Sequence, residues 1–194
     1  MGFFPKLVCV LCIVSTHGDH TFEKITVHVR AHYDYKLKEI LKEEKTSVNF
    51  VEKMIVTLNT KFQEPQFLEE KGISIPVEFY LDASGSHDTK LIYIDLRGSE
   101  TEITAESAKA AFRHYGQSEV KHGANAVLLL MIAPEEKSDM YNNIFNEATI
   151  QGGACSENCT TAVGVPQIHP SLANDTARNM AKLLKGSACL RNNN

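Results

Sequence analysis

Apolar residues recur with two different spacings along the chain, and each spacing predicts a different kind of secondary structure. Between residues 22 and 32 apolar and polar residues alternate, which predicts a strand with one buried face. Over 46–62 the apolar residues recur every three or four positions, which predicts a long amphipathic helix packed on a sheet. Gly72 is expected to end this helical region, and strands are expected over 75–81 and 91–96.

The second half of the chain continues the alternation of helices and strands. Thr104 is a candidate cap for a helix over 105–115. Residues 124–133 are almost wholly apolar, which is typical of a strand buried on both faces. A short final strand over 162–165 precedes a last helix over 172–185. Alternating strands and helices predict an α/β domain of two or three layers.

Composition adds little to this prediction but narrows the function. The 194 residues are 43% hydrophobic and 23% charged, the proportions of an ordinary single globular domain. The formal net charge is -4 and no run of basic residues exceeds two, so nucleic acid is not an expected partner.

The first 18 residues have the layout of a secretory signal peptide, with an early lysine, an apolar run and small or polar residues at the end. The apolar run is shorter than the roughly 20 residues that span a bilayer. We therefore expect a signal peptide over 1–18, a single secreted extracellular domain over 19–194, and no membrane span.

Export would place three cysteines of the mature chain in an oxidising compartment: Cys155, Cys159 and Cys189. Three is an odd number, so one disulfide is expected, with either a leftover thiol or a disulfide-linked dimer. Two glycosylation sequons begin at Asn158 and Asn174, and both are compatible with export.

In this order, the segments resemble the catalytic domain of the reprolysin (adamalysin) branch of the metzincin zinc proteases, found in snake venoms and arthropod saliva. Residues 27–34, 50–62 and 124–132 are similar to the first strand, first helix and central strand of that domain. The most specific similarity is a glycine-rich segment with a cysteine, 152–155, followed by Ala162, Val163, Gly164 and Val165. In that family this region forms the edge strand that aligns peptide substrates before the zinc helix.

The resemblance implies a metzincin-like mixed sheet of about four to five strands packed with about three helices. Few residues follow Gly186, so the C-terminal subdomain is expected to be truncated. In that family the edge-strand cysteine commonly pairs with one near the C-terminus, which makes Cys155 with Cys189 one candidate disulfide. The local pair of Cys155 with Cys159 is the other candidate.

Family members carry the zinc motif HExxHxxGxxH in the last helix. Histidines four residues apart lie on one helix face and bind the same ion, the glutamate is the general base, and the glycine lets the chain deliver a third histidine. In this chain the two helical histidine positions correspond to Arg178 and Lys182, and the glutamate position to Asn179. The glycine and third-histidine positions correspond to Lys185 and Ala188.

None of these residues can perform the zinc chemistry of the motif. Arg178 and Lys182 are cations without a lone pair to donate to a metal, and Asn179 cannot take a proton from water. His169 is the last histidine in the sequence, so no shift of register supplies an imidazole here. We therefore expect no catalytic residue, no metal and no cofactor.

The leading hypothesis is a secreted, catalytically inactive metalloprotease-like protein that binds an extended peptide or a host protein, with the strand 162–165 as the candidate binding edge. One alternative is an active secreted zinc metalloendopeptidase with unrecognised ligands. Another is an unrelated secreted ligand-binding protein with a lipocalin-like fold. His28 and His32 do not supply the missing metal site, because residues four apart on a strand lie about 13 Å from one another.

Overall fold

The structure is a computed structural model that describes residues 24–33, 37, 50–82, 103–133, 135–165 and 172–191. Its strands are β1 (Ile25–Tyr33), β2 (Val77–Leu81), β3 (Ala126–Ile132) and β4 (Thr160–Val165). Its helices are α2 (Phe50–Lys61), α3 (Pro65–Lys71), α5 (Ala105–Val120), α6 (Ser138–Ala148), α7 (Leu172–Leu184) and α8 (Ala188–Arg191), with a 3-10 turn at Glu135–Lys137. The strand expected over 91–96 lies outside the described residues.

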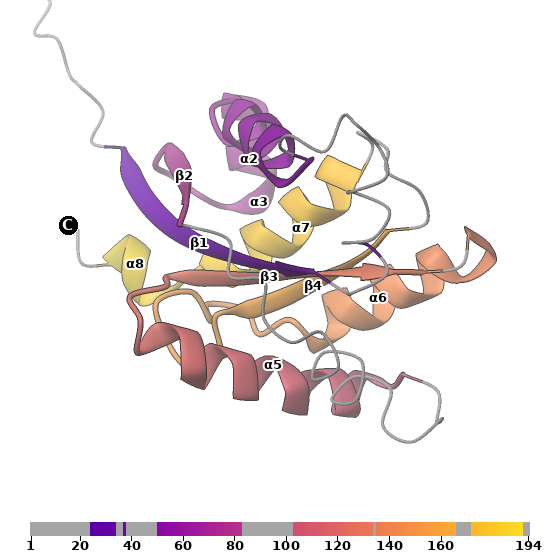
Figure 1. The fold of residues 1–194 in the computed structure, drawn as a ribbon. Helices are drawn as coiled ribbons and strands as arrows, with labels where there is room; N and C mark the ends of the chain where they lie inside the picture. The colour runs from indigo at the N-terminus through magenta and orange to yellow at the C-terminus, as the bar shows by residue number, and fades with distance from the viewer. Residues whose placement is uncertain are drawn as a thin grey trace, which may run out of the picture.

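The described strands form one sheet in the order β2-β1-β3-β4, and every neighbouring pair is parallel (Figure 1). The predicted α/β class is therefore confirmed. The expectation of a mixed sheet is corrected for this part of the chain, where all four strands run the same way and six helices replace the expected three. A parallel sheet joined by helices is also inconsistent with the lipocalin-like alternative, which would be all-β.

Helices cover both faces of the sheet, giving three layers (Figure 1). The helices α2, α3 and α7 pack on one face, and α5 and α6 pack on the other. The central strand β3 supplies side chains to both cores, because successive residues of a strand point to opposite faces. Leu128 and Leu130 join the first core, and Leu129 joins the second, which explains the unbroken apolar run.

The helix boundaries follow local chemistry. The helix predicted over 46–62 is observed as α2, and the rest of the helical region up to Gly72 is a separate helix, α3, which Pro65 begins. Gly72 ends α3 in the left-handed conformation at φ 67°, as predicted. Thr104 caps α5 by accepting a hydrogen bond from the backbone of Ser107, also as predicted, and the helix extends further than expected.

The helix α6 is the one described element of substantial length that the sequence pattern did not predict. Its buried residues Tyr141, Phe145 and Ala148 recur at helical spacing, but Asn142 is buried among them and interrupts the apolar pattern. This buried asparagine forms hydrogen bonds with the backbone of Gly164 in β4, the strand against which α6 packs.

A clasp formed by residues 151–155 holds the C-terminal end of α7. The backbone N–H groups of Gly152 and Ala154 donate to the carbonyls of Lys182 and Leu183, each at 3.1 Å. Cys155 then forms a disulfide with Cys189 of α8, with Cα atoms 5.7 Å apart, a normal spacing for this bond. A disulfide across a separation of 34 residues stabilises the folded chain by about 3 to 4 kcal/mol.

The pairing of Cys155 with Cys189 confirms one candidate disulfide and leaves Cys159 as a free, buried thiol. Within the described residues, no free cysteine is exposed for linking two chains. The same part of the chain contains no helix of the length and apolarity needed to cross a membrane.

Candidate functional site

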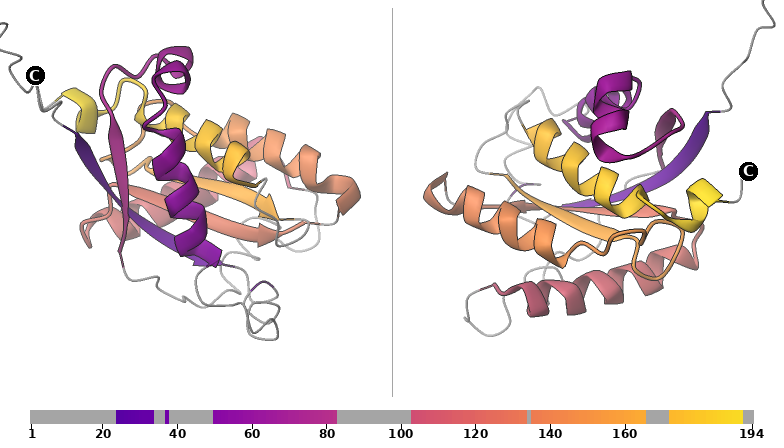
Figure 2. Two further views of the ribbon diagram at one scale, coloured as in Figure 1. Left: turned by 90° about the horizontal axis from the view of Figure 1, so that it is seen from above. Right: turned by 180° about the vertical axis from the view of Figure 1, so that it is seen from behind.

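The helix α7 lies between α6 on one side and α2 and α3 on the other, as seen from above and from behind (Figure 2). Its orientation is fixed by Ala177, Met180 and Leu184, which are buried against the sheet. Arg178 and Lys182 are one turn apart, so both side chains lie on the face that this packing leaves outward.

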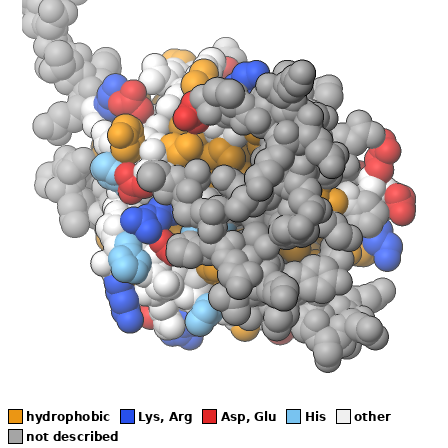
Figure 3. All heavy atoms as spheres, in the orientation of Figure 1, with side chains coloured by type: hydrophobic (Ala, Val, Ile, Leu, Met, Phe, Trp, Pro, Cys, Tyr) orange, Lys and Arg blue, Asp and Glu red, His pale blue; other side chains and the backbone are white. Residues whose placement is uncertain are grey.

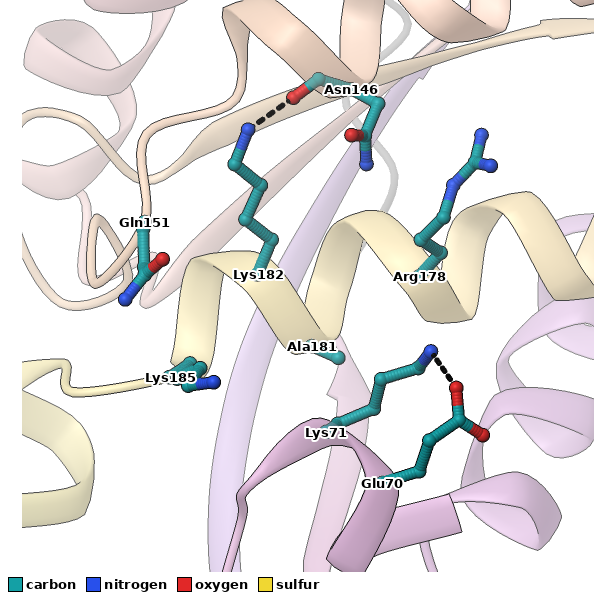
Figure 4. Close-up of a pocket in the computed structure, with 8 residues that line it drawn as sticks. All are labelled: Glu70, Lys71, Asn146, Gln151, Arg178, Ala181, Lys182 and Lys185. Carbon is teal, nitrogen blue, oxygen red and sulfur yellow. Dashed lines mark hydrogen bonds and ion pairs between the residues drawn. The ribbon is translucent and has the colours of Figure 1, made fainter.

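This outward face of α7 forms the floor of a pocket of about 230 Å³ (Figure 4). The walls come from α3, from α6 and from the turn after α6. The lining residues are Glu70, Lys71, Asn146, Gln151, Arg178, Ala181, Lys182 and Lys185. Arg178 and Lys182 extend from α7 toward α6, whereas Lys71 and Glu70 extend from α3 toward α7 (Figure 4).

The pocket is strongly positive on an acidic protein. Four of its lining residues are cations and only Glu70 is an anion, so four minus one gives a formal charge of +3, against -4 for the whole chain. Glu70 is paired with Lys71 at 2.6 Å, and Arg178 is paired with Asp175 at 3.1 Å. Both pairs are partly exposed to solvent, and ion pairs of this kind contribute little to stability.

Lys182 is a partly buried cation of the pocket. Its ammonium donates a hydrogen bond of 2.6 Å to the backbone carbonyl of Asn146 at the end of α6. Burial lowers the pKa of Lys182, and the positive charge of Lys109 adds to this effect while Glu147 opposes it. The folded protein thus holds an ammonium where positive charge is unfavourable, which is the environment that an anion would relieve.

Lys185 reaches across to α3 at the other end of the pocket. A Cβ atom built on Gly72 would lie 3.4 Å from both Cε and Nζ of Lys185. Gly72 ends α3 with a positive φ, so the side chain of Lys185 lies beside the end of this helix. Lys71 of α3 and Lys185, which follows α7, both line the pocket although they are far apart in the sequence.

Asn179, the position that the resemblance assigns to the catalytic glutamate, is absent from the pocket lining and has no exposed surface. Its Nδ2 donates to the carbonyl of Ala162 in β4 at 3.1 Å, and its Oδ1 accepts from Nδ2 of Asn146 at 2.7 Å. These two hydrogen bonds join α7 to β4 and α6, so the side chain of Asn179 holds the fold together.

The candidate binding edge, β4, is covered. Ala162, Val163 and Gly164 are buried, and Asn142 of α6 lies beside the strand. Oδ1 of Asn142 accepts from the Gly164 N–H at 2.7 Å, and its Nδ2 donates to the Gly164 carbonyl at 3.4 Å. The side-chain amide thus occupies the N–H and the carbonyl of Gly164, one of the residues of β4 with which an added strand could pair. Addition of a peptide at β4 would require these bonds to break.

The remaining predicted residues are dispersed. Ala188 is half-buried in α8, and Cys159 is buried at the start of β4. Asn174 is exposed in the first turn of α7, one turn from Arg178, whereas Asn158 is half-buried in the turn before β4. Of the two sequons, Asn174 is therefore the more accessible to solvent and to a glycan.

Polar residues also gather on β1, where histidine and charged side chains alternate along one side of the molecule (Figure 3). His28 lies 3.2 Å from Asp82, Arg30 binds Glu119 at 2.9 Å, and the buried His32 lies 3.5 Å from the same Glu119. The sequence pattern did not predict this network. It differs from the pocket in composition, because two carboxylates, Asp82 and Glu119, accompany Arg30 here.

Sequence reasoning singled out Arg178 and Lys182 but missed Lys71, Asn146 and Gln151 as their neighbours. Among the residues that the structure describes, no three His, Cys, Asp or Glu side chains are grouped so as to hold a metal ion. No family model matches the chain, and no curated protein is significantly similar to it.

Proposed function

We propose that the chain is a secreted, catalytically inactive metzincin-like protein that acts by binding an extracellular protein or peptide. The observation that carries the proposal is the composition of the exposed face of α7. The two positions assigned to zinc-binding histidines hold Arg178 and Lys182, and both line an open pocket. A guanidinium and an ammonium offer protons to a ligand rather than lone pairs to a metal.

The surroundings of Asn179 also support binding without cleavage. Its amide is buried between Ala162 and Asn146, away from the pocket in which a substrate would lie. An uncharged amide has no basic oxygen with which to activate water. Peptide hydrolysis at this pocket would therefore lack both the metal and the base that the family mechanism uses.

Secretion is supported by the disulfide between Cys155 and Cys189, since such bonds persist in oxidising compartments. The pocket on α7 is the better candidate surface for a partner than β4, where Asn142 bonds the backbone of Gly164. This favours recognition by side-chain charge over recognition by strand addition.

The test is to measure zinc content and peptidase activity on the same purified protein. We expect less than stoichiometric zinc by elemental analysis after incubation with zinc and desalting. We also expect no chelator-sensitive cleavage of a denatured protein substrate, with an active zinc protease as the positive control.

Stoichiometric zinc together with cleavage that a chelator abolishes would refute the proposal. In that case the active zinc metalloendopeptidase with unrecognised ligands would be the better description. The variant Arg178→Ala would then identify the site, since loss of cleavage would place the chemistry at α7.

A further inference from the structure

We propose that the pocket between α3, α6 and α7 is a binding site for an oxyanion group, a phosphate or sulfate ester carried by a larger extracellular ligand. This inference rests on the proposed binding function and names the chemical group that the pocket would recognise. The residues that carry it are Lys71, Arg178, Lys182 and Lys185.

The charge of the pocket favours a polyanionic group over a neutral ligand. Lys71 lies at the end of α3, Arg178 and Lys182 lie in α7, and Lys185 follows α7 directly. With Glu70 as the one anion of the lining, the formal charge of the pocket is +3. A phosphate ester carries a charge of about -1.5 to -2 at neutral pH and presents three acceptor oxygens. A phosphate ester could accept hydrogen bonds from several of the four cations at once. A single carboxylate has fewer oxygens and less charge, so it would leave most of the cations without a partner anion.

The hydrogen-bond donors of the pocket suit a group with several acceptor oxygens. Arg178 offers a planar fork of N–H groups, which binds oxyanions through two parallel hydrogen bonds. Lys182 has three N–H donors and its carbonyl contact with Asn146 uses one of them. The weak surface pairs of Arg178 with Asp175 and of Lys71 with Glu70 would be exchanged at little cost.

The size of the pocket indicates that it would hold one oxyanion group of a ligand rather than enclose the whole ligand. Its volume of about 230 Å³ is below the range of roughly 300 to 1,000 Å³ for pockets that enclose a drug-sized molecule. The pocket is bordered by the exposed residues Gln151, Arg178 and Lys185, so the rest of a ligand would extend into solvent.

The test is the dependence of the melting temperature on inorganic phosphate at pH 7, at constant ionic strength kept with sodium chloride. We expect a saturable rise for the wild type, from which an apparent Kd follows. The variants Arg178→Gln and Lys185→Gln should each weaken that Kd about tenfold or more, because each removes charge-assisted hydrogen bonds. Both residues are exposed, so both variants should fold.

The matched control is Lys53→Gln, which removes an exposed lysine of α2 outside the pocket and should leave the Kd unchanged. Phosphate and sulfate also stabilise proteins in general by exclusion from their surface. That general effect would appear equally in all variants. If Arg178→Gln and Lys185→Gln respond to phosphate as Lys53→Gln does, the proposed site is refuted.

Two further titrations distinguish the sources of the group. A phosphoserine peptide and a sulfated disaccharide are compared with their unmodified forms, and the form that competes with inorganic phosphate identifies the ester. Competition by neither ester would contradict the proposal. The result is separable from the proposed function, since zinc content and peptide cleavage are measured without any oxyanion.

Discussion

Cys159 is a thiol enclosed at the start of β4, with no exposed surface. Burial raises the pKa of this thiol from 9.0 to about 11, because the thiolate would lose its hydration inside the protein. The pKa of a thiol in the unfolded chain stays near the ordinary value. Folding therefore favours the protonated thiol, and the contribution of Cys159 to stability is complete below about pH 9 and lost as the pH rises toward 11.

The wild type should lose about 2 to 3 kcal/mol of unfolding free energy between pH 9 and 11 through this residue. Cys159→Ala should be less stable at neutral pH, because it leaves a small cavity, but should lose less free energy over the same range. Urea denaturation at each pH measures the difference, and mass spectrometry checks that Cys155–Cys189 stays intact. Parallel alkaline profiles for the two proteins would contradict the assignment.

At the scale of elements, the helix α5 packs closely on the turn that precedes β4. Arg113 and Gln117, one turn apart, both bind the carboxylate of Glu157, and these bonds, that of Arg113 first, lower the pKa of Glu157. Between them, Gly116 allows the backbone of Glu157 to approach. A Cβ atom at Gly116 would lie 2.0 Å from the carbonyl oxygen of Glu157.

Gly116→Ala should destabilise the protein by about 1 to 3 kcal/mol, as overpacked core substitutions do. In an exposed helix the same change would stabilise by roughly 0.5 to 1 kcal/mol. The sign of the effect therefore reports the contact with Glu157. Ser118→Ala, on the exposed side of α5, is the control and should change the melting temperature little. A stabilised Gly116→Ala protein would show that the turn is not packed as described.

At the scale of the whole molecule, each outer strand of the described part of the sheet has one residue whose backbone groups are bonded by an asparagine side chain from a covering helix. Asn59 of α2 accepts from the Phe79 N–H of β2 at 2.6 Å and donates to the Phe79 carbonyl at 2.9 Å. Asn142 of α6 bonds the two backbone groups of Gly164 in β4 in the same manner. Occupied edges protect a sheet against pairing with other chains.

Asn142→Ala should cost about 1 to 3 kcal/mol of stability, because it leaves buried backbone groups of Gly164 without their partner. It should also increase self-association through the freed edge, measured by light scattering over a concentration series. Asn143→Ala, the exposed neighbour on α6, is the matched control and should have neither effect. Equal stability of the two variants would rule out the role assigned to Asn142.

The sequence alone determined the elements whose signals are local. Alternation predicted β1, the unbroken apolar run predicted β3, and Thr104 and Gly72 marked the ends of helices, because these patterns depend on neighbours within one or two turns. The sequence also determined that α7 carries Arg178 and Lys182 in place of metal ligands, since residue identity needs no structure.

Only the tertiary structure decided which distant groups meet. The parallel strand order, the choice of Cys189 as the partner of Cys155, and the amide of Asn142 on Gly164 all join separate segments. The same is true of Lys71 facing α7 across the pocket. Such contacts have no periodic signature in the sequence, because they follow from how the helices pack on the sheet. That packing placed Arg178 and Lys182 in a basic pocket.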